Sequence, residues 1–235
     1  PAVFHAANLA LHAINAVLVF MVIRSLFPAL SPLLAAMLAA LFALHPLQVE
    51  PVAWVTALKD VLSATFSLLV ILLFVRSPSP SLSARQLAVL SGVFLLACLS
   101  KSTQVFLPLW LTWLGCVHWR IPWPRVATRL WPLFAIAAAV TLIAVTAQPD
   151  PKDMVFQEIW RRPLVAGDAL AFYAGKLVWP ARLALDYGRN PRFLFESGAV
   201  YLTGGLGLAA IVVVWWFRRR VHPWLLLGLG GVVLT

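Results

Sequence analysis

With 62% hydrophobic and only 11% charged residues, this chain of 235 residues is too apolar for a soluble domain, because soluble domains carry about 25% charged residues. The composition therefore predicts a membrane protein with several apolar helices. A net charge of +10 is also found in nucleic-acid-binding proteins, but the positions of the basic residues argue against a nucleic-acid partner.

The arginines between the apolar segments follow a regular order along the chain. They occur in every second connection, and these connections contain no carboxylate: Arg24; Arg76 and Arg85; Arg120, Arg125 and Arg129; Arg218, Arg219 and Arg220. This is the positive-inside pattern of membrane proteins. We therefore expect these connections in the cytoplasm and the acidic residues on the outer side. The expected location is the bacterial cytoplasmic (inner) membrane, or the ER membrane if the protein is eukaryotic.

Apolar segments in chain order predict the helices. They cover residues 4–26, 29–44, 52–75, 86–100, 103–119, 130–147, 199–217 and 223–235. The expected fold is all-α, a polytopic transmembrane bundle of about eight membrane segments. Some segments, 29–44 and 86–100 among them, are shorter than the about 20 residues of a spanning helix. We expect these to be buried among neighbours, with polar residues drawn into a recess on the outer side.

Residues 148–198 have a different character and are expected to form an extracytoplasmic region. Within it, 163–180 is apolar enough for a helix but contains Asp168 and Lys176. A single crossing there would reverse the orientation of every later segment. We therefore expect an interfacial or re-entrant helix that ends near Trp179 at the level of the lipid headgroups. The whole chain, 1–235, is expected to be one transmembrane domain that is cut at both ends.

Polar residues on the first segment form one candidate group. His5, Asn8, His12 and Asn15 follow a 3-4-3 spacing, so they share one face of a helix. Either this face hydrogen-bonds to a neighbouring helix, as Asn and His often do in membranes, or it contacts a substrate. His5 is nearest the outside and is the best substrate-binding candidate of the four.

A second group lies at the outer surface, between two apolar segments. His45 and a nearby carboxylate, Glu50, could act as acid and base, as metal ligands or as binders of sugar hydroxyls. Capping of the following helix is the structural alternative for Glu50. Lys59 and Asp60 follow in the outer part of the membrane, where ionisable groups are costly and a functional role is expected. Alternatively, they form a structural ion pair with another helix.

Two later stretches carry side chains suited to phosphates and sugars. Lys101 is flanked by hydroxyl residues in an outer turn, where it could hold a phosphate or simply extend to the interface. The run 176–192 supplies further candidates: Lys176, Arg182, Asp186 and Tyr187. Such residues also occur in any solvated loop, so each is a weak signal by itself.

Several of these stretches together carry a family resemblance. They are FHAANLALHAIN at 4–15, HPLQVEPVAW at 45–54, KDVLS at 59–63, LSK at 99–101 and GKLVWPARLA at 175–184. In this order they resemble the GT-C membrane glycosyltransferases, above all the TMTC-type O-mannosyltransferases and their bacterial relatives with tetratricopeptide repeats. The block at 45–63 is the most specific part of the resemblance.

The resemblance implies a GT-C-like fold and an enzyme of protein O-mannosylation. Such an enzyme transfers a sugar, mannose-like here, from a polyprenyl-phosphate donor to a hydroxyl of a protein or glycan acceptor on the extracytoplasmic side. Lys101 and Arg182 would suit the donor phosphate, and His45 and Glu50 the sugar or the acceptor. The candidate catalytic residues are then His45, Glu50 and Asp60, and the substrate-binding candidates are His5, Lys59, Lys101, Lys176, Arg182, Asp186 and Tyr187. A divalent metal is left open.

The sequence departs from the family pattern at its start, Pro1. In the family, the acidic catalytic residues lie in the first extracytoplasmic loop, after a helix that precedes the stretch resembling residues 4–15. We therefore expect the main catalytic acidic residues upstream of Pro1. The 235 residues would then hold part of a binding site without the usual general base, and would be inactive alone.

Two alternatives to a glycosyltransferase remain open at this point. One is a transporter or lipid flippase, in which Lys59, Asp60 and the His/Asn stripe of the first segment form a polar pathway. The other is a non-catalytic membrane scaffold.

Overall fold

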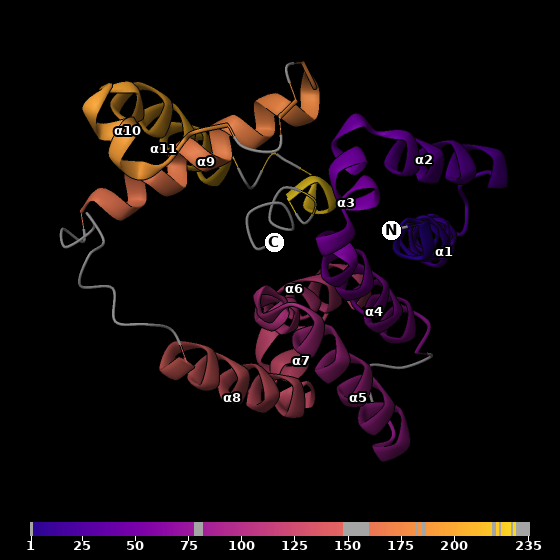
Figure 1. The fold of residues 1–235 in the computed structure, drawn as a ribbon. Helices are drawn as coiled ribbons and strands as arrows, with labels where there is room; N and C mark the ends of the chain where they lie inside the picture. The colour runs from indigo at the N-terminus through magenta and orange to yellow at the C-terminus, as the bar shows by residue number, and fades with distance from the viewer. Residues whose placement is uncertain are drawn as a thin grey trace. The chain divides into compact units, whose positions relative to one another are not determined.

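A computed structural model describes residues 2–77, 82–147, 160–181, 183–184, 187–217, 220, 222–226 and 228. These residues form helices, turns and loops, and they contain no β-strand (Figure 1). The expected all-α class is therefore confirmed. The described residues up to 147 belong to one compact unit, and those from 160 onward belong to a second. We call them unit 1 and unit 2 and describe each by itself.

Unit 1 is a bundle in which α1 packs against α2 and α4, and α4 packs against α5. Its elements are α1 (Ala2–Leu26), α2 (Pro32–Leu44), η1 (Pro46–Gln48), α3 (Val49–Ala53), η2 (Val55–Ala57), α4 (Leu58–Val75), α5 (Ala84–Ser100), η3 (Ser102–Phe106), α6 (Leu107–Trp119), α7 (Trp123–Arg129) and α8 (Trp131–Ala147). The start of α1 contacts the segment before α4, and the ends of both helices meet where Arg76 Nε donates to Ser25 Oγ. These two helices therefore run in the same direction.

Local sequence explains several helix ends. Ser31 accepts a hydrogen bond from Leu34 N ahead of Pro32, a proline at the first helical position. Ser83 and Gln86 form a reciprocal capping box at the start of α5. The predicted helix 52–75 is interrupted, because Trp54 has an extended backbone with φ −88° and ψ 123° between α3 and η2.

Helix length and composition support an integral membrane protein. Val3–Leu26, Val55–Val75 and Ala199–Phe217 are each long and apolar enough to cross a membrane. Two bent pairs, Pro32–Leu44 with Pro46–Ala53 (50°) and Trp123–Arg129 with Trp131–Ala147 (70°), raise the number to five if each pair is one span. The described residues thus support three to five spans rather than about eight. The reason is length, because α5 and α6 have only 17 and 13 residues, and most of the segment 223–235 lies outside the described residues.

The arginines and the carboxylates of unit 1 lie at opposite ends of the bundle. Phe74 near the end of α4 packs 4.6 Å from Trp119 at the end of α6, and Val126 of α7 lies against the same part of α6. The arginines at the ends and connections of these helices, and Arg24 at the end of α1, therefore lie at one end of the bundle. The carboxylates of unit 1, Glu50 and Asp60, belong to the segments at the other end. This separation agrees with the positive-inside pattern of the sequence. The orientation of unit 1 in a membrane stays a prediction.

Unit 2 is built on two helices that approach each other very closely. Its elements are α9 (Arg161–Val178), α10 (Pro191–Glu196) and α11 (Ala199–Phe217). A Cβ atom at Gly207 would overlap the carbonyl oxygen of Gly167, and one at Gly204 would overlap that of Leu164. Such contacts between small residues are a common way for membrane helices to pack. α9 corresponds to the expected helix 163–180 and is not among the candidate spans; its interfacial or re-entrant position stays a prediction.

Candidate functional site

Lys101 and Asp60 form an ion pair at the carboxylate-bearing end of unit 1. The Lys101 Nζ atom lies 2.8 Å from Asp60 Oδ1, and the two side chains are 40% and 30% exposed. Asp60 lies in the first turn of α4, where the helix dipole favours a carboxylate. Lys101 follows α5 with an extended backbone that ends this helix. The pair therefore joins α4 to α5 and still leaves the ammonium accessible to a ligand.

Further along α4, polar side chains form hydrogen bonds with η3. Ser67 Oγ donates to Gln104 Oε1 over 2.8 Å, and Gln104 Nε2 donates to Ser63 Oγ over 3.4 Å. Sequence analysis missed these three residues. The 3-4 spacing of Asp60, Ser63 and Ser67 is the signal that could have found them, because it places the three on one face of α4. This face meets Lys101 and Gln104.

His45 has a local structural role. Its Nδ1 atom accepts a hydrogen bond from Leu47 N over 3.2 Å, and its extended backbone (φ −63°, ψ 132°) separates α2 from η1. The proton of a neutral ring therefore lies on Nε2. The histidine that was predicted as catalytic thus caps the next turn, and its ring is half-buried.

Glu50 and Lys59 lie exposed at the same end of unit 1. Glu50 belongs to the first turn of α3, where a carboxylate stabilises the helix start. Neither side chain forms an ion pair with another described residue. Of the candidates in the segment 45–60, Asp60 forms an ion pair with another predicted residue, Lys101.

The polar face of α1 packs against backbone carbonyls. Asn8 Nδ2 donates to Trp54 O over 2.9 Å, His12 Nε2 contacts Ala43 O at 3.0 Å, and Asn15 Nδ2 donates to Val61 O over 3.1 Å. All three side chains are buried, whereas His5 is exposed. The interpretation as a hydrogen-bonded seam is confirmed for the three buried residues. His5 stays a candidate for substrate contact.

The start of the chain bears on where a general base could come from. The main catalytic acidic residues were expected upstream of Pro1, and Pro1 itself lies outside the described residues. That expectation therefore stays a prediction. Among the described carboxylates of unit 1, Glu50 is exposed and Asp60 is held by Lys101.

A second group of predicted residues lies beside a cavity of about 410 Å³ in unit 2. The Lys176 ammonium lies 5.0 Å from the Tyr187 ring centroid and 5.5 Å from that of Phe172, and the two rings meet edge to face. Lys176 and Tyr187 are thus brought together, while their assignment to a substrate stays a prediction. Contact of a cation with aromatic rings is a favourable arrangement.

The same cavity contains a buried carboxylate that was not among the predicted site residues. Asp168 is 3% exposed; Arg189 Nη2 donates to its Oδ1 atom over 2.5 Å, and the Thr203 hydroxyl donates to the same oxygen. A buried charge requires such partners. The signal in the sequence was a carboxylate within an apolar helix, which marks a functional or paired residue.

Other charged residues of this region are placed elsewhere or not described. Arg192 forms a 2.8 Å ion pair with Glu196 on the exposed face of α10, and the hydrogen bond and charge of Glu196 raise the pKa of Arg192. Arg192 therefore pairs with Glu196, whereas Asp168 pairs with Arg189. The predicted substrate-binding residues Arg182 and Asp186 lie outside the described residues.

A search for metal ligands among the described residues and comparisons with known proteins gave the following results. Within the part of the chain that the structure describes, no three His, Cys, Asp or Glu side chains gather as metal ligands would. Comparison with protein-family models, with curated proteins and with solved structures found no match. The chemistry of the site is therefore inferred from its own residues.

Proposed function

We propose that the protein is an integral-membrane glycosyltransferase with a GT-C-like bundle. It transfers a mannose-like sugar from a polyprenyl-phosphate donor to a hydroxyl of a protein or glycan acceptor on the extracytoplasmic side. The observation that supports this proposal is the accessible Lys101–Asp60 pair, at the end of unit 1 opposite the arginines.

The chemistry of Lys101 suits a donor phosphate. An ammonium group has three donors, and the contact with Asp60 engages one side of it while 40% of the side chain stays exposed. A phosphate oxygen can therefore bind the remaining donors in a charge-assisted hydrogen bond. Asp60 acts as a positioning residue, because it holds the ammonium before the donor arrives.

The transfer step forms a bond between the acceptor oxygen and the anomeric carbon of the sugar. The bond from this carbon to the phosphate oxygen breaks, and polyprenyl phosphate leaves with the electron pair. A carboxylate accepts the proton of the acceptor hydroxyl. We do not assign this role to Asp60, because its Oδ1 atom pairs with Lys101. Glu50 and His45 are assigned to sugar or acceptor hydroxyls, and Lys59 and His5 to the surroundings of the donor.

A transporter or flippase is less well supported. That alternative uses the polar residues of α1 as a pathway for a substrate. Asn8, His12 and Asn15 instead contact backbone carbonyls and are buried. Their polar groups therefore contribute to helix packing, and we retain the enzyme as the proposal.

The proposal is tested with membranes that contain the full-length protein. Sugar transfer from a radiolabelled polyprenyl-phosphate mannose is measured for the wild type and for Lys101→Gln. Loss of a hydrogen bond to a charged group amounts to about 1.5–3 kcal/mol, so kcat/KM for the donor should fall about 10- to 100-fold. The matched control is Arg125→Gln, which removes an exposed cation at the opposite end of unit 1.

The outcome separates a binding role from a purely structural one. Asp60→Asn keeps the size of the side chain but removes the charge that holds Lys101, so it should raise KM more than it lowers kcat. The control variant should retain wild-type transfer. Wild-type kcat/KM for Lys101→Gln, or no transfer by the wild type with any polyprenyl-phosphate sugar, would refute the proposed function.

A further inference from the structure

The cavity of about 410 Å³ in unit 2 is formed by α9, α10 and the loop that precedes α10. Its volume is within the range of about 300–1,000 Å³ that is typical of small-molecule sites. In the loop, Gly188 has a φ of 61°, a left-handed conformation that glycine adopts readily. Its two neighbours both contact Phe172 of α9: the Tyr187 ring meets it edge to face, and the Arg189 guanidinium lies 4.8 Å from its centroid. The loop is thus held against α9, and the proposed transfer step assigns no role to this cavity.

The charged residues of the lining compensate each other. Arg189 Nη2 donates to Asp168 Oδ1 over 2.5 Å, and the lining contains no further carboxylate, ammonium or guanidinium. Lys176 lies beside the cavity, and its ammonium contacts the rings of Phe172 and Tyr187. The lining itself therefore carries no net charge. A neutral ligand is favoured, because a charged one would be enclosed there without a counter-charge.

The lining retains both acceptors and donors of hydrogen bonds. The two hydrogen bonds to the Asp168 side chain end on Oδ1, and Oδ2 accepts none from a described residue. Asn190 Oδ1 accepts from Phe193 N at the start of α10, which leaves both hydrogens of Nδ2 for a ligand. A hydroxyl group both donates and accepts, so it matches such a mixed set of groups.

Aromatic rings supply the apolar part of the same lining. Phe172 contacts the rings of Tyr173 and Tyr187 edge to face, with centroids 5.7 Å and 4.9 Å apart. Tyr173 is 61% exposed. The negative face of an aromatic ring attracts weakly positive C–H groups. A pyranose ring carries C–H groups on its faces and hydroxyls around its edge, and it therefore matches both parts of the lining.

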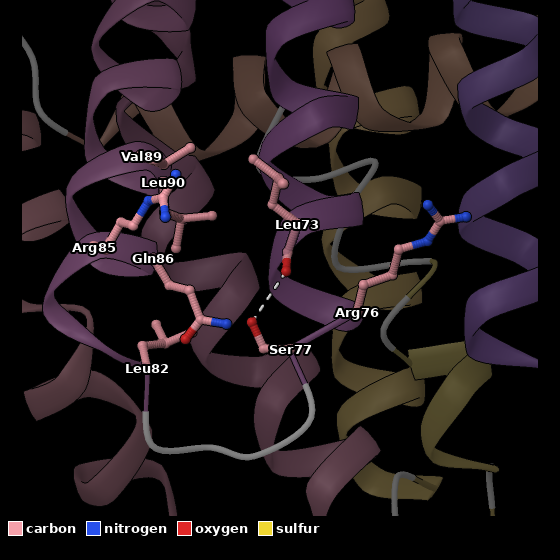
Figure 2. A pocket seen from close by; sticks show the side chains of 8 residues that line it. All are labelled: Leu73, Arg76, Ser77, Leu82, Arg85, Gln86, Val89 and Leu90. Carbon is pink, nitrogen blue, oxygen red and sulfur yellow. Dashed lines mark hydrogen bonds between the residues drawn. The ribbon is translucent and has the colours of Figure 1, made fainter.

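The cavity of about 390 Å³ between the end of α4 and the start of α5 lacks this combination. Figure 2 shows the Arg76 side chain directed away from it toward α1, where Nε donates to Ser25 Oγ over 3.3 Å. Ser77 Oγ donates to Leu73 O, and Gln86 Oε1 accepts from Ser83 N. These polar groups stabilise the helix ends, and we assign no ligand to that cavity.

We propose that the cavity of unit 2 binds a neutral pyranose, with one face of the sugar ring against Tyr173 and its hydroxyls toward Asp168 and Asn190. The inference does not depend on glycosyl transfer, because residues of unit 2 alone form the cavity and a free sugar binds there without a donor. Both a glycan and the lipid-linked donor carry such a ring, and the experiment distinguishes these two sources.

The test measures binding of methyl α-mannopyranoside to the full-length protein by saturation-transfer difference NMR. The protein is held in lipid nanodiscs, so that no sugar-based detergent competes. Loss of the aromatic contact in Tyr173→Ala should weaken binding about 5-fold. Asn190→Ser keeps a residue suited to the start of α10 but removes the amide donors, and it should also weaken binding about 5-fold.

The matched control is Tyr201→Ala, which removes a ring of similar exposure (56%) from α11, outside the cavity lining. It should retain wild-type affinity for the sugar. Equal affinities of the two tyrosine variants would overturn the proposal, and so would the absence of binding by the wild type. Tetrahydropyran-2-methanol, which lacks the ring hydroxyls, should not compete; equal competition by it, or displacement of the sugar by millimolar inorganic phosphate, would also overturn the proposal.

A second ligand identifies the source of the ring. A polyprenyl-phosphate mannose is titrated into the wild type and into Tyr173→Ala. Weaker binding of this lipid by the variant would assign the cavity to the sugar of the donor, whereas unchanged binding would assign it to a glycan. Binding of methyl α-mannopyranoside by a protein that transfers no sugar would refute the proposed function and leave this inference standing.

Discussion

The close contact between α9 and α11 allows a sharp prediction for Gly207→Ala. A Cβ atom at Gly207 would lie 2.9 Å from Gly167 Cα and would overlap the Gly167 carbonyl oxygen. These are backbone atoms, so no side-chain rotation can relieve the overlap. α9 must move away by about 1 Å to restore ordinary carbon–carbon contact. A gap of this size weakens each van der Waals contact between the two helices by about a quarter to a half.

The expected size of the effect combines two opposing contributions. Overpacking of this kind costs about 1–3 kcal/mol, and the upper value applies because the blocking atoms belong to the backbone. Replacing a helical glycine by alanine stabilises the helix by about 1 kcal/mol, because alanine has the higher helix propensity. Gly207→Ala should therefore destabilise unit 2 by about 2 kcal/mol, a change of about 30-fold in the ratio of folded to unfolded protein.

The matched control is Gly205→Ala, two positions away on the same helix. A Cβ atom there meets nothing within 4 Å, so only the propensity gain remains and the variant should equal or exceed wild-type stability. The assay is unfolding by sodium dodecyl sulfate in mixed micelles, followed by circular dichroism. Equal unfolding midpoints for Gly207→Ala and Gly205→Ala would refute the close contact between the two helices.

Two further predictions concern buried polar groups and use the same unfolding assay. Asp168→Asn should destabilise the protein by about 3 kcal/mol, because it leaves Arg189 beside the cavity without its counter-charge; adding Arg189→Gln should recover part of the loss, and wild-type stability of Asp168→Asn would contradict the argument. Asn8→Ala should cost about 1 kcal/mol through loss of the 2.9 Å hydrogen bond to Trp54 O, whereas His5→Ala on the exposed part of the same helix should leave the unfolding midpoint unchanged.

The positions of most helices could be predicted from the sequence, because apolar runs mark them. The expected segments 4–26 and 199–217 correspond closely to α1 and α11. The number of membrane spans was overestimated because apolar runs such as those of α5 and α6 form helices of only 17 and 13 residues. Trp54, where the predicted helix 52–75 is interrupted, accepts a hydrogen bond from Asn8, which lies 46 residues away in the sequence. Two bends, of 50° after α2 and of 70° between α7 and α8, decide whether three or five spans are counted.

Candidate site residues were easier to identify than their partners. A carboxylate or a lysine in an apolar segment stands out, so Asp60 and Lys101 could be named from the sequence. Their ion pair depends on how α5 packs against α4, which no local pattern encodes. Asp168 was noticed only as an unusual residue within a helix. Its partner Arg189 comes from a loop 21 residues later, where charged residues are common and carry little signal.

The seam on α1 also positions the proposed donor site, although none of its buried residues is assigned to a substrate. Asn8 donates to Trp54 O, which also accepts a hydrogen bond from the backbone N–H of Ala57 at the break before α4. This contact joins α1 to the segment that leads into α4, and the first turn of α4 carries Asp60. Asp60 in turn holds Lys101. The ammonium that we assign to the donor phosphate is therefore linked to α1 through successive contacts, and the structural and functional polar residues of unit 1 form one connected arrangement.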